Sequence, residues 1–270
     1  METKEELELE LRKIEVWEND QKGLWFWEKL GRIPFMLLDK VTPAFIQNKI
    51  SSLLDELGQF LQTGGKYLVQ EQHILSKFNQ NLPPDTQVHS IEEVSQVPLQ
   101  TMYKISSELS KSRQNIATVQ GATTGFGGIF TLAIDIPVLL GLSLKTLQEI
   151  AIVYGYDPND RAERIFIVKS LQFASADVVG KQAILKELAG FYKREEHQKE
   201  MMSQLQGFRE VVYTYRDQFG WKKLFQLIPV AGMVFGAFIN RSMISDISEA
   251  GTMLYQKRRI MERLHSKNKD

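Results

Sequence analysis

Two glycine-rich, apolar stretches constrain the fold of this chain more than any other feature of its sequence. The first covers residues 115–144, where Asp135 is the only charged residue, and the second covers residues 224–240, which carry no charge. Glycine inside a helix costs about 1 kcal/mol relative to alanine. Several glycines in helical sequence therefore need a packing reason, which we take to be the close approach of another backbone.

The spacing of these glycines favours contact between helices. Gly121 and Gly125 are four residues apart, as are Gly232 and Gly236, and Gly128 extends the first set. Small residues at every fourth position form one flat helix face, which lets two backbones approach each other. We therefore predict that the two stretches pack together as a helical hairpin.

A phosphate-binding loop is the other interpretation of residues 121–128, and the flanking residues argue against it. Such a loop needs a lysine and a hydroxyl residue after its last glycine, or a strand before it and a helix after it. Here Ile129 and Phe130 follow, and no strand is predicted before the glycines. We therefore predict no nucleotide cofactor at this position.

Signals that start and stop helices recur along the rest of the chain. Thr42-Pro43 begins an apolar pattern with a 3.6-residue period that ends at Gly64-Gly65. Ser90 has the spacing of a capping box, and Gly155 ends one helix where Asp157-Pro158 begins the next. The sequence has no alternating β-branched runs bounded by hairpin turns. These signals predict an all-α fold.

The length of 270 residues suits one large domain or two small ones. We predict a multi-helix single domain with a central glycine-rich apolar helical hairpin. In this domain, amphipathic N-terminal helices (residues 1–80) pack against a larger helical region (residues 90–263). The first ten residues hold five glutamates and do not resemble an export signal, which favours a cytoplasmic protein.

Neither apolar stretch fits a simple membrane span, which needs about 20 predominantly apolar residues. Pro229 interrupts the second stretch, and the segment Asp135-Ile136-Pro137 interrupts the first. We predict that Asp135 caps a helix that begins at Ile136, with Pro137 in its first turn. Burial in a protein core is the favoured interpretation, and conditional insertion into a membrane is the alternative.

Tryptophans beside lysines are favoured at a lipid–water interface, so contact with a membrane is one interpretation of these residues. The residues concerned are Trp25, Phe26, Trp27, Trp221, Lys222 and Lys223. The alternative is that these rings attach the N-terminal helices to the core. Basic residues near the C-terminus, between Lys257 and Arg263, either face anionic headgroups or form a solvated helix face.

Composition argues against several chemistries. Thirty-three basic residues balance 33 acidic ones, whereas a nucleic-acid partner calls for a basic excess. Cysteine is absent, which excludes disulfides, thiolate metal sites and a cysteine nucleophile. The four histidines lack the spacing of metal ligands, and no catalytic signature is present. We predict no catalytic residue, no metal, no cofactor and no nucleic-acid partner.

Residues 121–158 resemble the signature of the bacterial EcsC family, which has a glycine-rich start, an aliphatic-Asp-aliphatic-Pro step and a Tyr-Gly-Tyr/Phe-Asp ending, here Tyr-Gly-Tyr-Asp. Residues 228–258 are similar to the C-terminal part of that family, where Ile-Pro, spaced glycines and an asparagine precede a basic helix. The matching positions here are Asp135, Pro137, Tyr154, Gly155, Asp157, Gly232, Gly236 and Asn240. We predict that Asp135 forms a buried polar pair with Asn240 and Arg241 where the apolar stretches meet.

The resemblance implies a bacterial protein of the cytoplasm or membrane surface, linked to an ABC transporter or to an envelope or secretion process. It supplies no catalytic residues. We predict a non-enzymatic accessory protein that is peripheral at the inner face of the cell membrane, with the membrane surface or a membrane protein as its partner. The alternative is an enzyme, or a small-molecule or lipid binder, with a pocket between the apolar helices. The sequence leaves the oligomeric state open.

Overall fold

The structure is a computed structural model, and it describes residues 2–21, 56–64, 69–126, 129–176, 178–191 and 229–268. Inside its helices, the side chains described exclude those of residues 125–126, 129–136, 178–179, 190–191, 229–232 and 235. Every regular element in the described ranges is a helix, and these ranges contain no strand. The predicted all-α class is therefore confirmed for this part of the chain.

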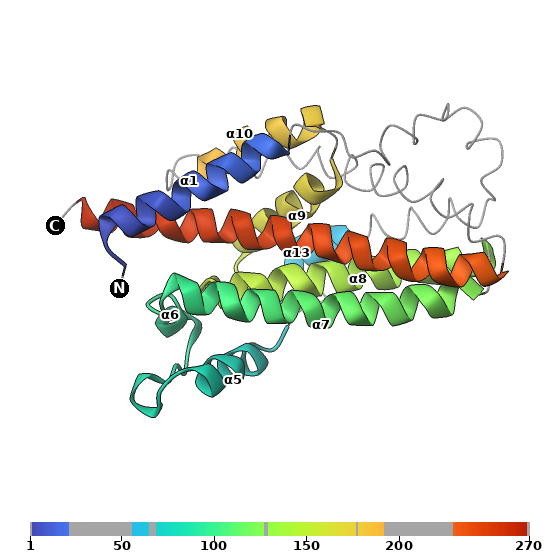
Figure 1. Cartoon of the computed structure of the whole chain (residues 1–270), viewed down its shortest axis with the longest axis horizontal. Helices are drawn as coiled ribbons and strands as arrows, with labels where there is room; N and C mark the ends of the chain where they lie inside the picture. The colour runs from blue at the N-terminus through green and yellow to red at the C-terminus, as the bar shows by residue number, and fades with distance from the viewer. Residues whose placement is uncertain are drawn as a thin grey trace.

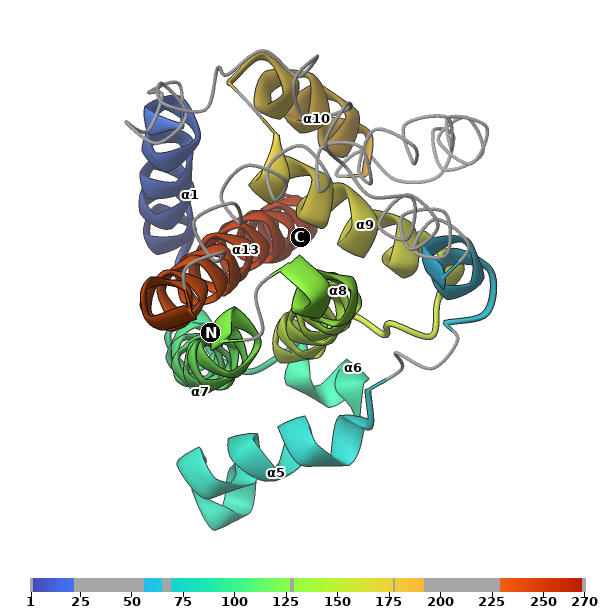
Figure 2. The same cartoon turned by 90° about the vertical axis from the view of Figure 1, so that its right-hand side faces the viewer.

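Three long helices run side by side and form the centre of the molecule (Figure 1). They are α7 (Leu99–Phe126), α8 (Ile129–Val153) and α13 (Pro229–Lys267). Helices α7 and α8 are antiparallel neighbours in sequence, and α13 runs antiparallel to α7, so that its start lies beside the end of α7 (Figures 1 and 2). The described parts of both apolar stretches therefore meet at one end of this bundle.

The remaining helices cover the flanks of the bundle (Figure 2). Helix α1 (Lys4–Asp20) packs on α13, α9 (Arg161–Ser175) packs on α8 and α13, and α10 (Val178–Phe191) packs on α9. On another side, α5 (Glu71–Asn81), the 3₁₀ turn η2 (Pro84–Thr86) and α6 (Ile91–Val94) lead into α7. Buried apolar side chains from Leu7 in α1 to Ile260 in α13 form one contiguous cluster. The single-domain assignment itself stays a prediction.

Local sequence explains how several helices begin and end. The helix at residues 56–63 ends at Gly64, which has φ = 79°. Ser90 caps α6 by accepting a hydrogen bond from the backbone N–H of Glu93 at 3.3 Å. Gly155 ends α8 with φ = 78°. The bonds from Gly155 N to Ile152 O and from Tyr156 N to Ala151 O, both 2.9 Å, form a Schellman motif. The two glycine ends and the Ser90 cap are confirmed, whereas Glu93 accepts from the backbone N–H of His89 at 2.6 Å and not from that of Ser90, as a capping box would require.

Two predicted helix starts are wrong. Helix α8 runs from Ile129 to Val153 without a break, so Asp135 does not cap a new helix, and Pro137 lies inside this one. Proline in a helix interior costs about 3 kcal/mol. Helix α8 packs against α7, α9 and α13, and this burial outweighs the cost. The helix expected at Pro158 begins at Arg161, since residues 157–160 form a turn held by a 2.8 Å bond from Asn159 N to Asp157 Oδ1.

The predicted central hairpin of residues 115–144 and 224–240 is not shown by the structure. Residues 115–144 are divided between α7 and α8, and residues 224–228 lie outside the described ranges. The bundle end is built from three helices and not from a pair. Within the described ranges, none of the helices combines the length and the apolar character needed to cross a membrane.

Candidate functional site

One end of the three-helix bundle is almost free of charge, and we call it the apolar end. It comprises residues 114–126 of α7, 129–144 of α8 and 229–240 of α13. Asp135 is the single charged residue in these segments. At the opposite end, arginines of α13 contact helix α9, the turn that ends α8 and the segment before α7, and we call it the arginine end.

Helices α7 and α13 touch backbone to backbone at the apolar end. A Cβ atom built on Gly121 would lie 2.1 Å from the carbonyl oxygen of Gly236, far inside van der Waals contact. Ala117, one turn from Gly121, is fully buried. The structure thus brings together one glycine from each predicted set. The surroundings of Gly125 and Gly232 are not described, and Gly128 lies outside the described ranges.

Polar side chains border this contact. The Arg241 guanidinium donates from one nitrogen to Asn115 Oδ1 at 3.0 Å and to Thr118 Oγ1 at 3.4 Å, which ties α13 to α7. Asn240 is fully buried. The Asp135 side chain is not among those described, so its predicted pairing with Asn240 and Arg241 stays a prediction.

Large apolar side chains are exposed at the apolar end. Of the nine exposed large hydrophobic residues in the described ranges, six lie there, which makes this end the main apolar surface of that part of the chain. Val119 and Val234 are the most open, with 67% and 68% of their surface exposed. The others are Ile116, Val138, Met233 and Phe238.

The arginine end is built around a buried charged pair. Glu163 of α9 accepts hydrogen bonds from Arg258 Nη1 at 2.8 Å and from the Tyr255 hydroxyl at 2.6 Å. Burial raises the pKa of Glu163 above its usual range, and the neighbouring Arg258 opposes that shift. Arg258 also lies over the ring of Tyr156, 4.0 Å from its centroid. A cation on an aromatic face and beside a carboxylate is stabilised by both.

Arg259 fastens α13 to the Tyr-Gly-Tyr-Asp turn that ends α8. It donates to the carbonyl oxygen of Tyr154 at 2.9 and 2.6 Å and to that of Gly155 at 3.2 Å. These carbonyls belong to the negative end of the α8 dipole, where a cation is favoured. A side chain on Gly155 would approach Ser95 to 2.9 Å, so the turn also abuts the segment before α7. This motif therefore anchors α13.

The start of the chain closes the same end. Arg263 donates to the carbonyl oxygens of Ser95 and Val97 at 2.7 Å and to Glu2 Oε2 at 2.7 Å. Glu2 Oε1 accepts from the backbone N–H of Leu99 at 2.6 Å, which caps α7 from another segment. Burial acts to raise the pKa of Glu2, but the bond from Leu99 and the charge of Arg263 lower it overall.

The sequence predicted that the basic residues between Lys257 and Arg263 face either anionic headgroups or solvent. Both interpretations are wrong. Lys257 pairs with Glu18 of α1 at 2.7 Å. The side chains of Arg258, Arg259 and Arg263 are at most 13% exposed and bind protein groups. They face neither solvent nor a membrane, because the packing of α1 and α9 on α13 encloses them.

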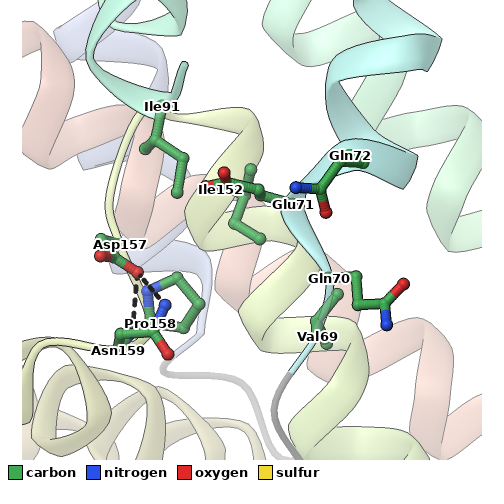
Figure 3. A pocket seen from close by; sticks show the side chains of 9 residues that line it. All are labelled: Val69, Gln70, Glu71, Gln72, Ile91, Ile152, Asp157, Pro158 and Asn159. Atoms are coloured by element: carbon green, nitrogen blue, oxygen red, sulfur yellow. Dashed lines mark hydrogen bonds between the residues drawn. The ribbon is translucent and has the colours of Figure 1, made fainter. Parts of the chain in front are cut away.

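A cavity of about 260 Å³ lies beyond the C-terminal end of α8 (Figure 3). Asp157, Pro158 and Asn159 line it from the turn, and Val69 to Gln72, Ile91 and Ile152 line it from α5, α6, α8 and the segment before α5. One Asp157 carboxylate oxygen is already occupied by the backbone and side-chain nitrogens of Asn159. The cavity is not the predicted pocket between the apolar helices. The described residues include no acidic or histidine group arranged to hold a metal ion.

The predicted membrane-contact residues could not be compared with the structure. Trp25, Phe26, Trp27, Trp221, Lys222 and Lys223 are outside the described ranges. Their predicted contact with a membrane therefore stays a prediction.

Sequence reasoning missed the buried ion pairs. Arg113 of α7 binds both carboxylate oxygens of Glu149 in α8, and the Glu149 side chain is 1% exposed. Glu163 is 3% exposed. A local signal existed for Glu163, because it stands beside the apolar run Ile165-Phe166-Ile167, but its partner is 95 residues away in the sequence. Sequence separation of this kind hides the pairing.

The sequence of this chain matches a known protein family. The model of the EcsC protein family matches residues 8–260, and the chain is a member of that family.

Two relatives come from Bacillus subtilis (strain 168). The chain is 60% identical over 263 residues to "Uncharacterized protein YdbA", covering 97% of this chain and 96% of that protein. It is 28% identical over 171 residues to "Protein EcsC", covering 63% of this chain and 69% of that protein. No solved structure matches the chain with statistical significance.

Proposed function

We propose that this protein is a non-enzymatic accessory protein that docks peripherally on the cytoplasmic face of the cell membrane through the apolar end of its bundle. The observation that carries the proposal is the exposure of six large apolar side chains on that end. Apolar surface removed from water contributes roughly 25 cal/mol per Å². A lipid surface offers such burial without any change in the fold.

Peripheral docking also suits the dimensions of the apolar end. Residues 229–240 of α13 extend about 18 Å at 1.5 Å per residue, whereas the hydrocarbon core of a bilayer is about 30 Å thick. The apolar end is thus too short to span the bilayer and long enough to enter one leaflet. Helices that lie at a membrane surface bury their apolar side chains about 5–10 Å deep.

We extend this proposal to a link with an ABC transporter or with an envelope or secretion process. This extension is supported by the family resemblance alone, and a membrane protein then becomes the alternative partner. No observation on the described residues favours the enzyme or small-molecule alternative over docking.

Vesicle flotation tests the proposal. The purified full-length chain is mixed with phospholipid vesicles, and the bound fraction is measured for the wild type, Val119→Asp and Val234→Asp. We expect each substitution to weaken binding at least about tenfold, because an aspartate near the acyl chains costs 1.4 kcal/mol or more. The matched control is Val16→Asp on α1, since Val16 is 59% exposed and lies on a helix that packs along the other part of α13.

Three outcomes are informative. Binding that is lost with Val119→Asp and Val234→Asp but kept with Val16→Asp supports the proposal. Wild-type protein that ignores vesicles but binds native membranes stripped of peripheral proteins would identify a membrane protein as the partner. Wild-type protein that binds neither would overturn the docking function.

A further inference from the structure

The charged residues that border the apolar end are basic on all three helices. On each helix we identify the first charged residue met on leaving the apolar end. It is Arg113 on α7, Arg241 on α13 and Lys145 on α8, where Asp135 lies within the apolar end itself. Arg113 is bound to the buried Glu149, and Lys111 follows it on α7. Lys111, Lys145 and Arg241 are exposed, and we call these three residues the basic collar.

On each of the three helices, with Asp135 of α8 as the exception, the nearest acidic residue stands farther from the apolar end than the collar residue of the same helix. Glu108 lies three residues beyond Lys111 on α7, and Asp246 lies five residues beyond Arg241 on α13. The acid nearest to Lys145 along α8, in the direction away from the apolar end, is Glu149, which is buried and paired. Along each helix the order is therefore apolar, then basic, then mixed charge, with Asp135 as the one acidic residue within the apolar segments.

The contact of Arg241 with Asn115 fixes how deep the apolar side chains lie below the collar. Val234 precedes Arg241 by seven residues, and Val119 follows Asn115 by four, both toward the apolar end. At 1.5 Å per residue, Val234 lies about 10 Å and Val119 about 6 Å below that contact. These depths match the 5–10 Å to which surface helices enter the headgroup and acyl boundary. Arg241 would then stand among the lipid phosphates.

We infer that the basic collar binds anionic phospholipid headgroups, so that the apolar end docks on negatively charged membranes in preference to neutral ones. This inference rests on the proposed docking function and names the lipid class that it uses. Long basic side chains bury their stems against apolar surface and place their charges at the headgroups. Each such charge near an anionic surface strengthens binding about fivefold.

Binding to two kinds of vesicle tests the inference with the full-length protein. One kind contains phosphatidylcholine alone, and the other contains phosphatidylcholine mixed with phosphatidylglycerol. The variant is Lys111→Gln with Lys145→Gln, because both lysines are exposed. The matched control is Lys186→Gln with Lys267→Gln, which removes the same charge from exposed lysines on α10 and at the far end of α13.

We expect the wild type to prefer vesicles with phosphatidylglycerol, and the collar variant to lose about 25-fold in binding to them while keeping its binding to phosphatidylcholine. The control is expected to behave as the wild type. High salt is expected to weaken the preference, since it screens the charges.

Equal binding of the wild type to both vesicles, or an equal loss in the collar variant and the control, would overturn the inference and leave the proposed docking intact. A wild type that binds neither vesicle would instead count against the docking function itself. Arg241→Gln is a further variant, expected to lose about fivefold on anionic vesicles alone. A loss on both kinds of vesicle would show that Arg241 acts by holding α7 and α13 together.

Discussion

At the arginine end, charged side chains hold α13 to its neighbours, whereas at the apolar end α13 touches α7 through the backbones of two glycines. Arg258, Arg259 and Arg263 bind a carboxylate, helix carbonyls and the start of the chain. The apolar end has the Gly121–Gly236 contact and exposes six large apolar side chains. The arginines of α13 at the arginine end are turned inward, whereas Arg241 beside the apolar end is exposed.

This difference separates stability from function. Substitutions at the arginine end break buried interactions, so they are expected to lower the free energy of unfolding. Substitutions of exposed side chains at the apolar end remove no internal contact of this kind, so they are expected to change binding alone. Four predictions test this division, beginning with the largest effect.

Glu163→Gln is expected to lower the free energy of unfolding by about 3–5 kcal/mol, because it leaves the buried Arg258 without its carboxylate. Chemical denaturation monitored by circular dichroism measures the loss. Replacing both Glu163 and Arg258 by methionine removes the charges together and is expected to recover most of the stability. A single variant as stable as the wild type would show that this pair does not hold the arginine end together.

Gly121→Ala is expected to lower the free energy of unfolding by about 2–3 kcal/mol, because the new methyl group would overlap the Gly236 backbone and force α7 from α13. Gly58→Ala is the matched control. Gly58 lies in the helix at residues 56–63 with no atom near its missing side chain, so alanine there is expected to add up to about 1 kcal/mol. Thermal unfolding of both variants would reveal the opposite signs, and equal shifts would contradict the close contact.

Glu2→Gln is expected to lower the free energy of unfolding by about 1 kcal/mol at neutral pH, since Glu2 bonds to Leu99 N and to Arg263. The pKa of Glu2 is lower in the folded state than its usual value of 4.5, so the unfolded chain binds the proton more strongly. The contribution of Glu2 is therefore full above pH 4.5 and is lost as the pH falls through the folded pKa. Denaturation of both proteins between about pH 3 and pH 7 should show curves that converge in acid. A difference that is constant with pH would exclude the ionised carboxylate as its source.

Val234→Asp and Val119→Asp are expected to change the free energy of unfolding by no more than about 0.5 kcal/mol, because both side chains are exposed. The same variants are expected to lose membrane binding, as described above. Denaturation curves measured beside the flotation assay check both statements. A loss of 2 kcal/mol or more, on the scale of a core substitution, would mean that these side chains pack inside the protein and would remove the contrast between the two ends.

Much of the secondary structure follows from local sequence. Ser90 at an N-cap and Gly64 and Gly155 at helix ends act within one turn of their own positions, so their patterns predict helix boundaries. The step at Pro137 misled the prediction because proline normally ends a helix. The packing of α8 on three other helices overrides that local preference.

The candidate site was less accessible from the sequence. Spaced glycines predicted a close helix contact but did not show which glycine meets which, and the structure brings Gly121 to Gly236. The sequence predicted that the basic C-terminal residues lie on the surface. In the structure, Arg259 is buried and donates a hydrogen bond to the carbonyl oxygen of Tyr154. A charge on a helix gives no sign of burial until its partner is known, and these partners come from distant segments.

The sequence by itself determined the all-helical class, several helix ends, and the uncharged character of the segments that form the apolar end. These properties depend on composition and on neighbours within a few residues, which any window of the chain contains. Only the tertiary structure decided that the described parts of the two apolar stretches share one end of a three-helix bundle and that Arg258, Arg259 and Arg263 are turned inward. It also decided that Lys111, Lys145 and Arg241 border the apolar surface. Those relations join residues up to about 260 positions apart, as Glu2 and Arg263 are, and such distances are fixed by packing.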